Sequence, residues 1–259
     1  MSLKLRQIAL VTHDLKKTVA ELSTLFDIEV CYNDTAVEYF GLENAVFTFG
    51  GTFIEVVSPT QEGTTAGRLL EKRGGDGGYM VILETGDIAA DRQRLENKQL
   101  QTVLDVDLEE AISIHIHPRE LGSLLSVEEM KLAGSWHWGG PDWQSMRDST
   151  LVQRVSAAIV QSEDLQATAR RWADATGVMP ESEDGGLLLG LDMGDVHLVT
   201  AGDGRGPGLA GMIIDVKNLD EILSRANSLG LPCDKDSVTV SGVRFVLNPS
   251  PSEKEANNK

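Results

Sequence analysis

A pattern of one strand, one helix and further strands recurs four times along the chain, and this repeat constrains the fold more than any other feature. In each copy an apolar, strand-like run leads into a segment whose apolar residues are spaced as one face of a helix. The opening strands are expected at 7–11, 79–84, 155–160 and 212–216, and the helices at 15–26, 88–98, 165–176 and 219–229. The period of about 70 residues exceeds that of short solenoid repeats, so we expect paired modules.

Strand-like runs follow each helix, and their number differs between the copies. In the first copy the last two runs are separated by Gly50 and Gly51, which favour a tight hairpin. The runs lie at 28–32, 45–49 and 52–58 in the first copy, 101–104, 113–117 and 123–127 in the second, 187–191 and 196–200 in the third, and 237–240 and 243–247 in the fourth. The sequence therefore predicts an α+β fold of repeated βαβββ modules, with a fourth copy that lacks its last strand.

The segment between the second and third copies carries turn-forming residues. Gly134, Gly139, Gly140 and Pro141 argue against regular structure there. We predict a first domain at 1–130 that holds two modules and the site, a Trp- and Gly-rich linker at 131–150, and a second, degenerate domain at 151–249. The polar segment 250–259 is expected to be disordered.

Charge and composition exclude several classes of partner. The 259-residue chain has a formal net charge of −17 and no basic patch, so neither a nucleic acid nor an anionic membrane surface is an expected partner. No apolar stretch approaches the roughly 20 residues of a membrane-spanning helix. Cys31 and Cys233 are expected to be reduced thiols, and no export signal is visible. We therefore predict a cytoplasmic protein.

Four segments together resemble the vicinal oxygen chelate superfamily, which includes glyoxalase I, methylmalonyl-CoA epimerase, extradiol dioxygenases and bleomycin-resistance proteins. The segments are IALVTHDL and TFIEVVSP in the first copy, and YMVILETGDI and IHIHPRELGSLLSVEE in the second. The resemblance implies that paired modules curl into cup-shaped mixed β-sheets, forming two glyoxalase-like domains. The second half of the chain matches the family only in the order of its elements.

The resemblance also implies a site on the first and fourth strands of each module, where the family holds a divalent metal with His, Gln and Glu side chains. These positions correspond to Gln7, Glu55, Tyr79 and Ser126, and in the second half they fall near Ala157, Leu198 and Gly211. A phenol and a hydroxyl are poor ligands for Zn²⁺, Fe²⁺, Ni²⁺ or Mn²⁺. We therefore assign no metal ligands, and no cofactor is expected.

Glu55 stands in the otherwise apolar run FIEVV and is the candidate catalytic base. A carboxylate that faces a cup is costly to bury unless it is paired, and burial raises its proton affinity toward a range that suits proton abstraction beside a carbonyl. In the alternative, Glu55 alternates outward to water. Gln7 is likewise either a pocket amide or an exposed residue at the start of a strand.

Other polar and aromatic residues are candidates for substrate binding. His115 and His117 alternate on one strand face, where they form either a functional pair or an ordinary polar face. Trp136, Trp138 and Trp143 could close over an apolar ligand or attach the linker to the body. Arg68 could meet a substrate carboxylate or phosphate by bidentate contact. The predicted substrate-binding set is Gln7, Tyr79, Ser126, His117, Trp136, Trp138 and Arg68.

Three functions are compatible with these residues. The first is a glyoxalase-like lyase or isomerase that acts on a small carbonyl or carboxylate compound, with Glu55 as base. The second is a non-catalytic protein that sequesters a small molecule, as bleomycin-resistance proteins do, and its acidic surface would favour cationic ligands. The third is a structural homodimer whose cups are filled by its own side chains. The expected partner is a small-molecule ligand, and a homodimer is possible in each case.

Overall fold

The computed structural model describes residues 2–250, which form an α+β fold with two mixed β-sheets. The first module comprises β1 (Leu3–Val11), α1 (Leu15–Phe26), β2 (Val30–Tyr32), the 3-10 helix η1 (Thr35–Phe40), β3 (Leu42–Phe49) and β4 (Thr52–Pro59). The helix α2 (Thr65–Arg73) leads to the second module, which comprises β5 (Gly77–Thr85), α3 (Ile88–Asn97), β6 (Thr102–Asp107), β7 (Ala111–Ile116), α4 (Pro118–Leu121) and β8 (Leu124–Met130).

The second half of the chain repeats this order in two further modules. The connecting segment contains η2 (His137–Gly139) and α5 (Trp143–Met146). The third module comprises β9 (Val152–Ser162), α6 (Leu165–Thr176), β10 (Glu181–Glu183), β11 (Gly186–Gly190) and β12 (Asp195–Thr200), and the fourth comprises β13 (Gly208–Val216), α7 (Leu219–Ser228), β14 (Ser237–Val240) and β15 (Val243–Pro249). The predicted repeat is therefore confirmed.

The strands of the two halves form separate sheets. The eight-stranded sheet has the order β2-β3-β4-β1-β5-β8-β7-β6, and the seven-stranded sheet has the order β10-β11-β12-β9-β13-β15-β14. Hairpin neighbours such as β3 and β4 are antiparallel, whereas β5 and β8, β9 and β12, and β13 and β15 are parallel. Each parallel pair joins the first strand of a module to its last strand, with the helix in the connection between them.

The fourth module contains its last strand, so the prediction that this strand is missing is wrong. β15 pairs in parallel with β13, as β8 does with β5 and β12 does with β9. The described residues of the fourth module lack instead the short outer strand that β2, β6 and β10 supply elsewhere. In place of that outer strand, an isolated bridge joins Cys233 to Val238 of β14. The run 243–247 is therefore the last strand of the module, and the strand that the described residues lack is an outer one.

By packing, the chain divides into two compact units, each built from several segments. Of the described residues, the first unit takes 2–8, 79–137 and 157–210, and the second takes 9–78, 138–156 and 211–250. Each unit draws on both sides of the predicted boundary at 131–150, and the domain limits 1–130 and 151–249 stay a prediction. The backbone N–H of Ser250 donates to the carbonyl of Val216, and the rest of the predicted disordered tail lies outside the described residues.

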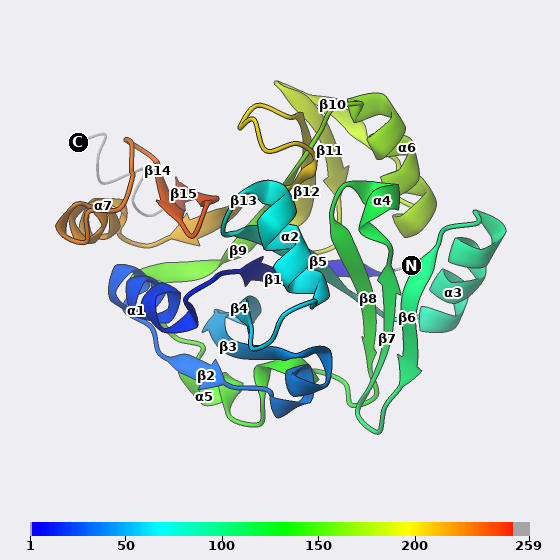
Figure 1. Cartoon of the computed structure of the whole chain (residues 1–259), viewed down its shortest axis with the longest axis horizontal. Coiled ribbons are helices and arrows are strands. Elements are labelled where there is room, and N and C mark those ends of the chain that lie inside the picture. Colours follow the sequence, from blue (N-terminus) through cyan, green and yellow to red (C-terminus); the bar gives the residue numbers. More distant parts are fainter. Residues whose placement is uncertain (1, 251–259) are drawn as a thin grey trace. The chain divides into compact units, whose positions relative to one another are not determined.

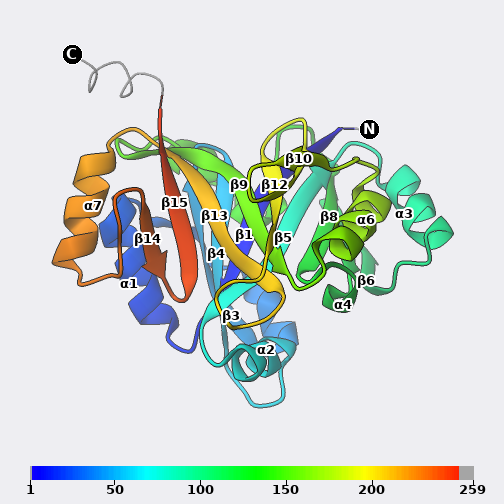
Figure 2. The same ribbon diagram turned by 90° about the horizontal axis from the view of Figure 1, so that it is seen from above.

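Within the first unit α3 and α6 pack side by side (Figures 1 and 2). The indole Nε1 of the fully buried Trp172 on α6 donates to the carbonyl of Leu121 at 2.9 Å. Within the second unit α1 packs against α7, as Figure 2 shows. There Phe26 of α1 contacts Phe49 edge-on and also Phe245, with ring centroids 5.4 and 5.7 Å apart. Each helix thus buries one apolar face, as the sequence periodicity predicts.

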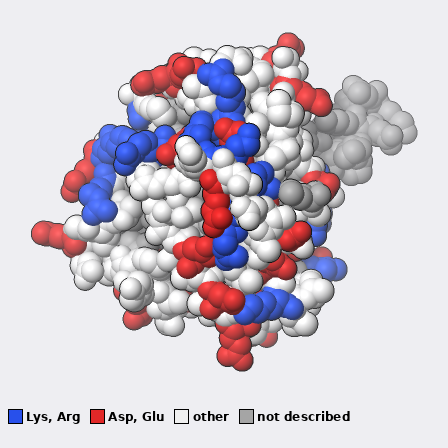
Figure 3. All heavy atoms as spheres, turned by 90° about the vertical axis from the view of Figure 1, so that its right-hand side faces the viewer, with Lys and Arg blue, Asp and Glu red and all other residues white. Residues whose placement is uncertain are grey.

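Figure 3 shows one face of the molecule, on which basic and acidic side chains are interspersed. Arg92 forms an ion pair with Asp105 at 2.7 Å, and Lys98 pairs with Asp174 at 2.7 Å. Exposed pairs of this kind contribute little to stability, about 0–1 kcal/mol each. Among the described helices, none has the length and apolar character that crossing a membrane requires.

Candidate functional site

Glu55 lies on the face of β4 that points away from α1. Phe49 packs against Phe26 of α1, and the antiparallel register places Phe47 opposite Ile54. Phe49, Phe47 and Ile54 therefore share the helix face, because side chains alternate along a strand. Glu55 follows Ile54 and takes the opposite face, where it is half-buried. The carboxylate thus lies on the face of the sheet opposite α1.

Asn44 on β3 holds the Glu55 carboxylate. Its amide Nδ2 donates to Oε1 of Glu55 at 2.7 Å, and its Oδ1 accepts the backbone N–H of Asp34 at 2.8 Å. The side-chain amide of Asn33 donates to the Asn44 carbonyl at 2.6 Å. Asn44 is only 5% exposed, so these contacts fix the orientation of its amide and hence of the carboxylate. The sequence prediction missed Asn44, which carries no motif.

An aromatic wall lies on the same face of β4. Phe53 is two residues before Glu55, and its ring meets Trp143 edge-to-face with centroids 5.2 Å apart. The connecting segment approaches closely at two glycines. A Cβ on Gly139 would lie 2.6 Å from the Phe53 ring, and one on Gly140 would lie 2.5 Å from the ring of Tyr32. Glycine is needed here because only it lets the segment reach these rings.

Gln7 and Trp136 form a buried pair in the first unit. The indole Nε1 of Trp136 donates to Oε1 of Gln7 at 2.8 Å. Trp136 is 1% exposed and Gln7 is 2% exposed. The Arg6 guanidinium lies 5.1 Å from the centroid of the Trp136 ring and forms an ion pair with Glu84 at 2.9 Å. The structure brings these two predicted site residues together, but the contact between them uses the oxygen of Gln7.

Ser126 belongs to a buried polar cluster on the first unit's sheet. The hydroxyls of Ser126 and Ser113 both donate to Oε1 of Glu128, the latter at 2.8 Å. All three residues are at most 2% exposed. The His115 Nε2 lies 3.9 Å from the same carboxylate oxygen, and burial lowers the pKa of His115 to about 4. His115 is therefore neutral near pH 7, and the sequence prediction chose its neighbour His117 instead.

The register of β5 separates Tyr79 from Ser126. Residue pairing places Met80 opposite Leu124 and Ile82 opposite Ser126. Met80 therefore shares the face of Ser126, whereas Tyr79 points to the other face. Helix starts give the same result, because Asp14 and Asp87 are equivalent N-caps that accept backbone N–H groups three residues onward. Counting back seven residues leads to Gln7 in the first module and to Met80 in the second, so Tyr79 does not hold the position equivalent to Gln7.

In the third module one predicted site position is also wrong by one residue. Ile159 lies two residues after Ala157, as Ile82 does after Met80, and it pairs with His197. The position equivalent to Ser126 is therefore His197 and not Leu198. The Nδ1 of His197 lies 2.7 Å from a carboxylate oxygen of Glu183. The predicted positions Ala157 and Gly211 agree with the N-caps Asp164 and Asn218.

Two predicted binding residues make local contacts that support helix starts. His117 is the N-cap of α4, and its Nδ1 accepts the backbone N–H of Arg119 at 3.0 Å. Arg68 is exposed on α2, where its guanidinium donates to the Gly63 carbonyl at 2.6 Å and to the Thr65 hydroxyl at 2.9 Å. These contacts give both residues a structural role within their own segment.

The donor set does not fit a divalent metal. At the four positions that the resemblance implies, the structure has Gln7, Glu55, Met80 and Ser126, of which a carboxylate is the single strong ligand for a divalent ion. The Gln7 side-chain oxygen accepts the indole N–H of Trp136, and the Ser126 hydroxyl donates its hydrogen to Glu128. Among the described residues, no group of three or more His, Cys, Asp or Glu side chains could hold a metal ion. No step of the proposed chemistry is therefore assigned to a metal.

Comparison with known proteins places this geometry in context. A family model described as a glyoxalase-like domain matches residues 8–176. No curated protein matches the sequence. Among solved structures, a hypothetical protein from Staphylococcus aureus has a TM-score of 0.71 at 15% identity, and the match covers 96% of this chain and 100% of that one. This likeness shows the fold.

Shorter structures match about half of the chain. A methylmalonyl-CoA epimerase from Streptomyces coelicolor, in complex with 2-nitronate-propionyl-CoA, matches with a TM-score of 0.44 at 21% identity over 50% of this chain and 98% of that one. A methylmalonyl-CoA epimerase from Mycobacterium tuberculosis matches with a TM-score of 0.45 at 18% identity over 50% of this chain and 89% of that one. We draw no conclusion about activity from these matches.

Proposed function

Because the chain belongs to the glyoxalase-like domain family of the vicinal oxygen chelate superfamily, we propose that it is an enzyme of the lyase or isomerase type that acts on a small carbonyl or carboxylate compound. In this proposal Glu55 is the base that removes a proton from the carbon beside the substrate carbonyl. The fold alone supports many chemistries, so the proposal depends on the surroundings of Glu55.

The observation that carries the proposal is the hydrogen bond from Asn44 to Glu55. A carboxylate that takes a proton from carbon must be held at a defined angle to that carbon. Asn44 provides this, because its own amide is fixed by the N–H of Asp34 at 2.8 Å while it donates to Glu55 at 2.7 Å. An outward-facing, purely solvated carboxylate would need no such support. The geometry therefore favours a functional carboxylate over the solvated alternative.

The reaction class follows from where the proton goes next. Glu55 takes the proton and leaves an enolate on the substrate. Return of the proton by Glu55 to the same carbon regenerates the substrate, return to a neighbouring atom isomerises it, and loss of a group beside the enolate completes an elimination. Trp138 and the Phe53–Trp143 wall are proposed to contact the apolar part of the substrate. Substrate contacts by Gln7, Tyr79, Ser126, His117, Trp136 and Arg68 stay predictions.

A second function, sequestration of a small molecule, is favoured by the aromatic residues beside Glu55. Phe53 and Trp143 offer ring surfaces, and the net charge of −17 favours cationic ligands. In this alternative Glu55 would bind the cation electrostatically and would transfer no proton. The two functions thus assign the same carboxylate different roles, which an activity measurement separates.

The test is a turnover screen with the purified protein. 2-Oxo acids, 2-hydroxy acids, acyl thioesters and hydroxy ketones are incubated with the wild-type protein, and products are followed by NMR and chiral chromatography. The screen is repeated with Glu55→Gln and with Glu43→Gln, which removes an exposed carboxylate from the neighbouring strand. We expect turnover that falls by at least about 100-fold in Glu55→Gln, as is typical of a lost general base, and that persists in Glu43→Gln.

Two results would contradict the proposal. Turnover that survives in Glu55→Gln would assign the base to another residue. Absence of turnover, together with tight binding of an aromatic cation in calorimetry that weakens in Glu55→Gln, would support sequestration instead. Adding Mn²⁺, Zn²⁺, Ni²⁺ or Fe²⁺ under anaerobic conditions, with metal content measured in parallel, checks whether a metal contributes to either activity.

A further inference from the structure

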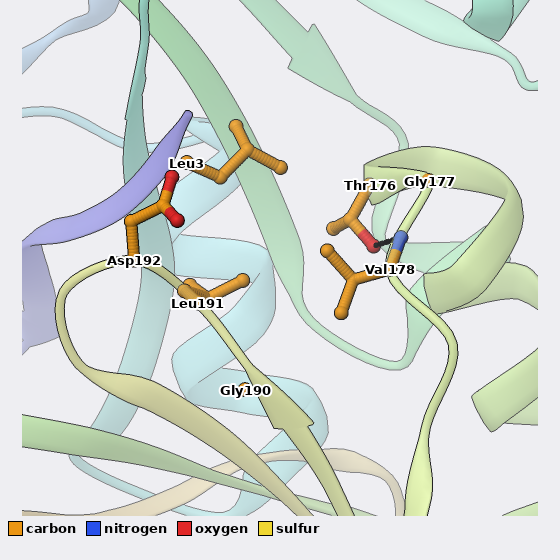
Figure 4. A pocket seen from close by; sticks show the side chains of 7 residues that line it. All are labelled: Leu3, Thr176, Gly177, Val178, Gly190, Leu191 and Asp192. Carbon is orange, nitrogen blue, oxygen red and sulfur yellow. Dashed lines mark hydrogen bonds between the residues drawn. The ribbon is translucent and has the colours of Figure 1, made fainter. Parts of the chain in front are cut away.

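A cavity of about 350 Å³ lies within the first unit, and its walls come from three segments of the chain (Figure 4). The start of β1 supplies Leu3, the end of α6 supplies residues 176–178, and the end of β11 with the following turn supplies residues 190–192. The volume is in the range of cavities that bind small organic ligands. None of the predicted site residues lines it.

The cavity wall combines apolar and polar surface. Leu3, Val178 and Leu191 line it, and Gly177 and Gly190 expose backbone between them. In Figure 4 the Leu191 side chain lies between Asp192 on one side and Val178 on the other. An apolar portion of a ligand would be favoured against Leu3, Val178 and Leu191, where a polar group would lose hydration without compensation.

Four hydrogen-bond donors of the wall are already used inside the protein. The Thr176 hydroxyl donates to the Trp172 carbonyl at 2.7 Å and accepts the backbone N–H of Val178 at 3.2 Å, the contact drawn in Figure 4. The backbone N–H of Gly177 donates within the helix end, and that of Asp192 donates to the Leu3 carbonyl at 2.9 Å. These four donors are therefore not available to a ligand, whereas the Asp192 carboxylate can accept hydrogen bonds from one.

The charge of the wall has one sign. Asp192 is the single ionisable residue that lines the cavity, and it forms no ion pair with any described residue. The carbonyl end of α6, which the left-handed Gly177 terminates, is capped by Arg94, whose guanidinium donates to the Ala175 carbonyl at 2.7 Å and pairs with Asp91. Lys4 lies 3.7 Å from Glu84.

We propose that this cavity binds a small organic cation, a primary amine carried on an apolar group, with its ammonium on Asp192 and its apolar group against Leu3, Val178 and Leu191. This inference goes beyond the proposed function, because the site shares no residue with the surroundings of Glu55. The ammonium would donate hydrogen bonds to the Asp192 carboxylate, and the apolar group would fill the rest of the volume.

The test uses 2-phenylethylammonium as the probe and two analogues of similar shape, 2-phenylethanol and 3-phenylpropionate. Each is titrated into the ¹⁵N-labelled full-length protein, and backbone amide shifts are followed. We expect the ammonium to shift the amides of Gly177, Val178, Leu191 and Asp192, with weaker binding of the alcohol and no binding of the carboxylate. The Asp192→Asn variant should bind the ammonium about fivefold more weakly, which is the size of one partly exposed ion pair.

Asp184→Asn is the matched control, since it removes the same charge from the exposed turn between β10 and β11 and does not line the cavity. It should bind the ammonium as the wild type does. An unchanged spectrum outside the cavity shows that each variant is folded. The proposal is overturned if the three probes bind equally, if Asp192→Asn binds the ammonium as tightly as the wild type, or if no shifts appear around the cavity at millimolar concentrations of the probe.

Discussion

The hairpin between β3 and β4 depends on Gly50 for more than its turn geometry. Gly50 has a φ of +62°, and a Cβ placed on it would lie 1.9 Å from the backbone carbonyl oxygen of Gln153. Gly63 has a similar φ of +75°, but a Cβ there meets nothing within 4 Å. The pair therefore separates the cost of the left-handed backbone from the cost of the clash, because alanine imposes the first at both sites and the second at Gly50 alone.

The magnitude follows from these two terms. A left-handed alanine costs about 1–2 kcal/mol, partly offset by about 0.4–1 kcal/mol from the restricted unfolded chain, so Gly63→Ala should lose about 1 kcal/mol. In Gly50→Ala the Gln153 backbone must also move by more than an ångström. This shift strains the adjacent hydrogen bond from the Val155 N–H to the Thr52 hydroxyl, which is 2.8 Å long. We expect a further loss of about 2–3 kcal/mol, in line with other buried backbone clashes.

Urea unfolding measures the free energy of unfolding of both variants, and thermal melts measure their midpoints, each followed by tryptophan fluorescence. At about 2–4 °C per kcal/mol, Gly50→Ala should melt roughly 6–16 °C below the wild type, and Gly63→Ala only about 2–4 °C below it. If the two variants lose the same free energy of unfolding within about 0.5 kcal/mol, the close approach of the Gln153 backbone to Gly50 is refuted.

Three further predictions concern buried side chains. Trp172→Phe removes the hydrogen bond to the Leu121 carbonyl and leaves a void, so the free energy of unfolding should fall by about 2–3 kcal/mol in urea titrations; a loss under about 1 kcal/mol would contradict this packing. Because burial lowers the pKa of His115 to about 4, below its ordinary value of 6.5, the unfolded chain takes up its proton first. The stabilising contribution of neutral His115 is thus complete above about pH 6.5 and lost as the pH falls toward 4; NMR titration of the imidazole, assigned with His115→Gln, would contradict this by showing a midpoint near 6.5. Burial also raises the pKa of the Cys31 thiol to about 11, so iodoacetamide at pH 8 should modify Cys233 well before Cys31, and equal rates would refute this.

Sequence reasoning recovered the modules because their signals are local. The helices repeat an apolar spacing, and the two glycines at 50 and 51 enforce a hairpin whose register the structure confirms from Phe49 to Thr52. The one-residue error at Tyr79 has a physical cause. The run 79–84 is apolar on both faces, so the alternation of its side chains does not indicate which residues point to which face of the sheet. The N-cap Asp87 fixes the alignment with the first module, because counting back seven residues from it identifies Met80 as the equivalent of Gln7.

The contacts of the candidate site could not be read from the sequence. Glu55 stood out as a charge in an apolar strand, but Asn44 looked like any polar residue, and its role depends on a loop whose N–H groups reach it in space. In the same way, Gln7 and Trp136 are 129 positions apart in the chain, and nothing local indicates that the indole uses the Gln7 oxygen. The cavity at the end of α6 also joins three distant segments.

The measurement that tests the central proposal most directly is hydrogen–deuterium exchange at the carbon beside the carbonyl of a turned-over substrate, followed by NMR in D₂O. The account predicts that the wild-type protein and Glu43→Gln incorporate deuterium at the same rate, while Glu55→Gln is slower by at least about 100-fold. Deuterium incorporation by Glu55→Gln at the wild-type rate would contradict the assignment of Glu55 as the base.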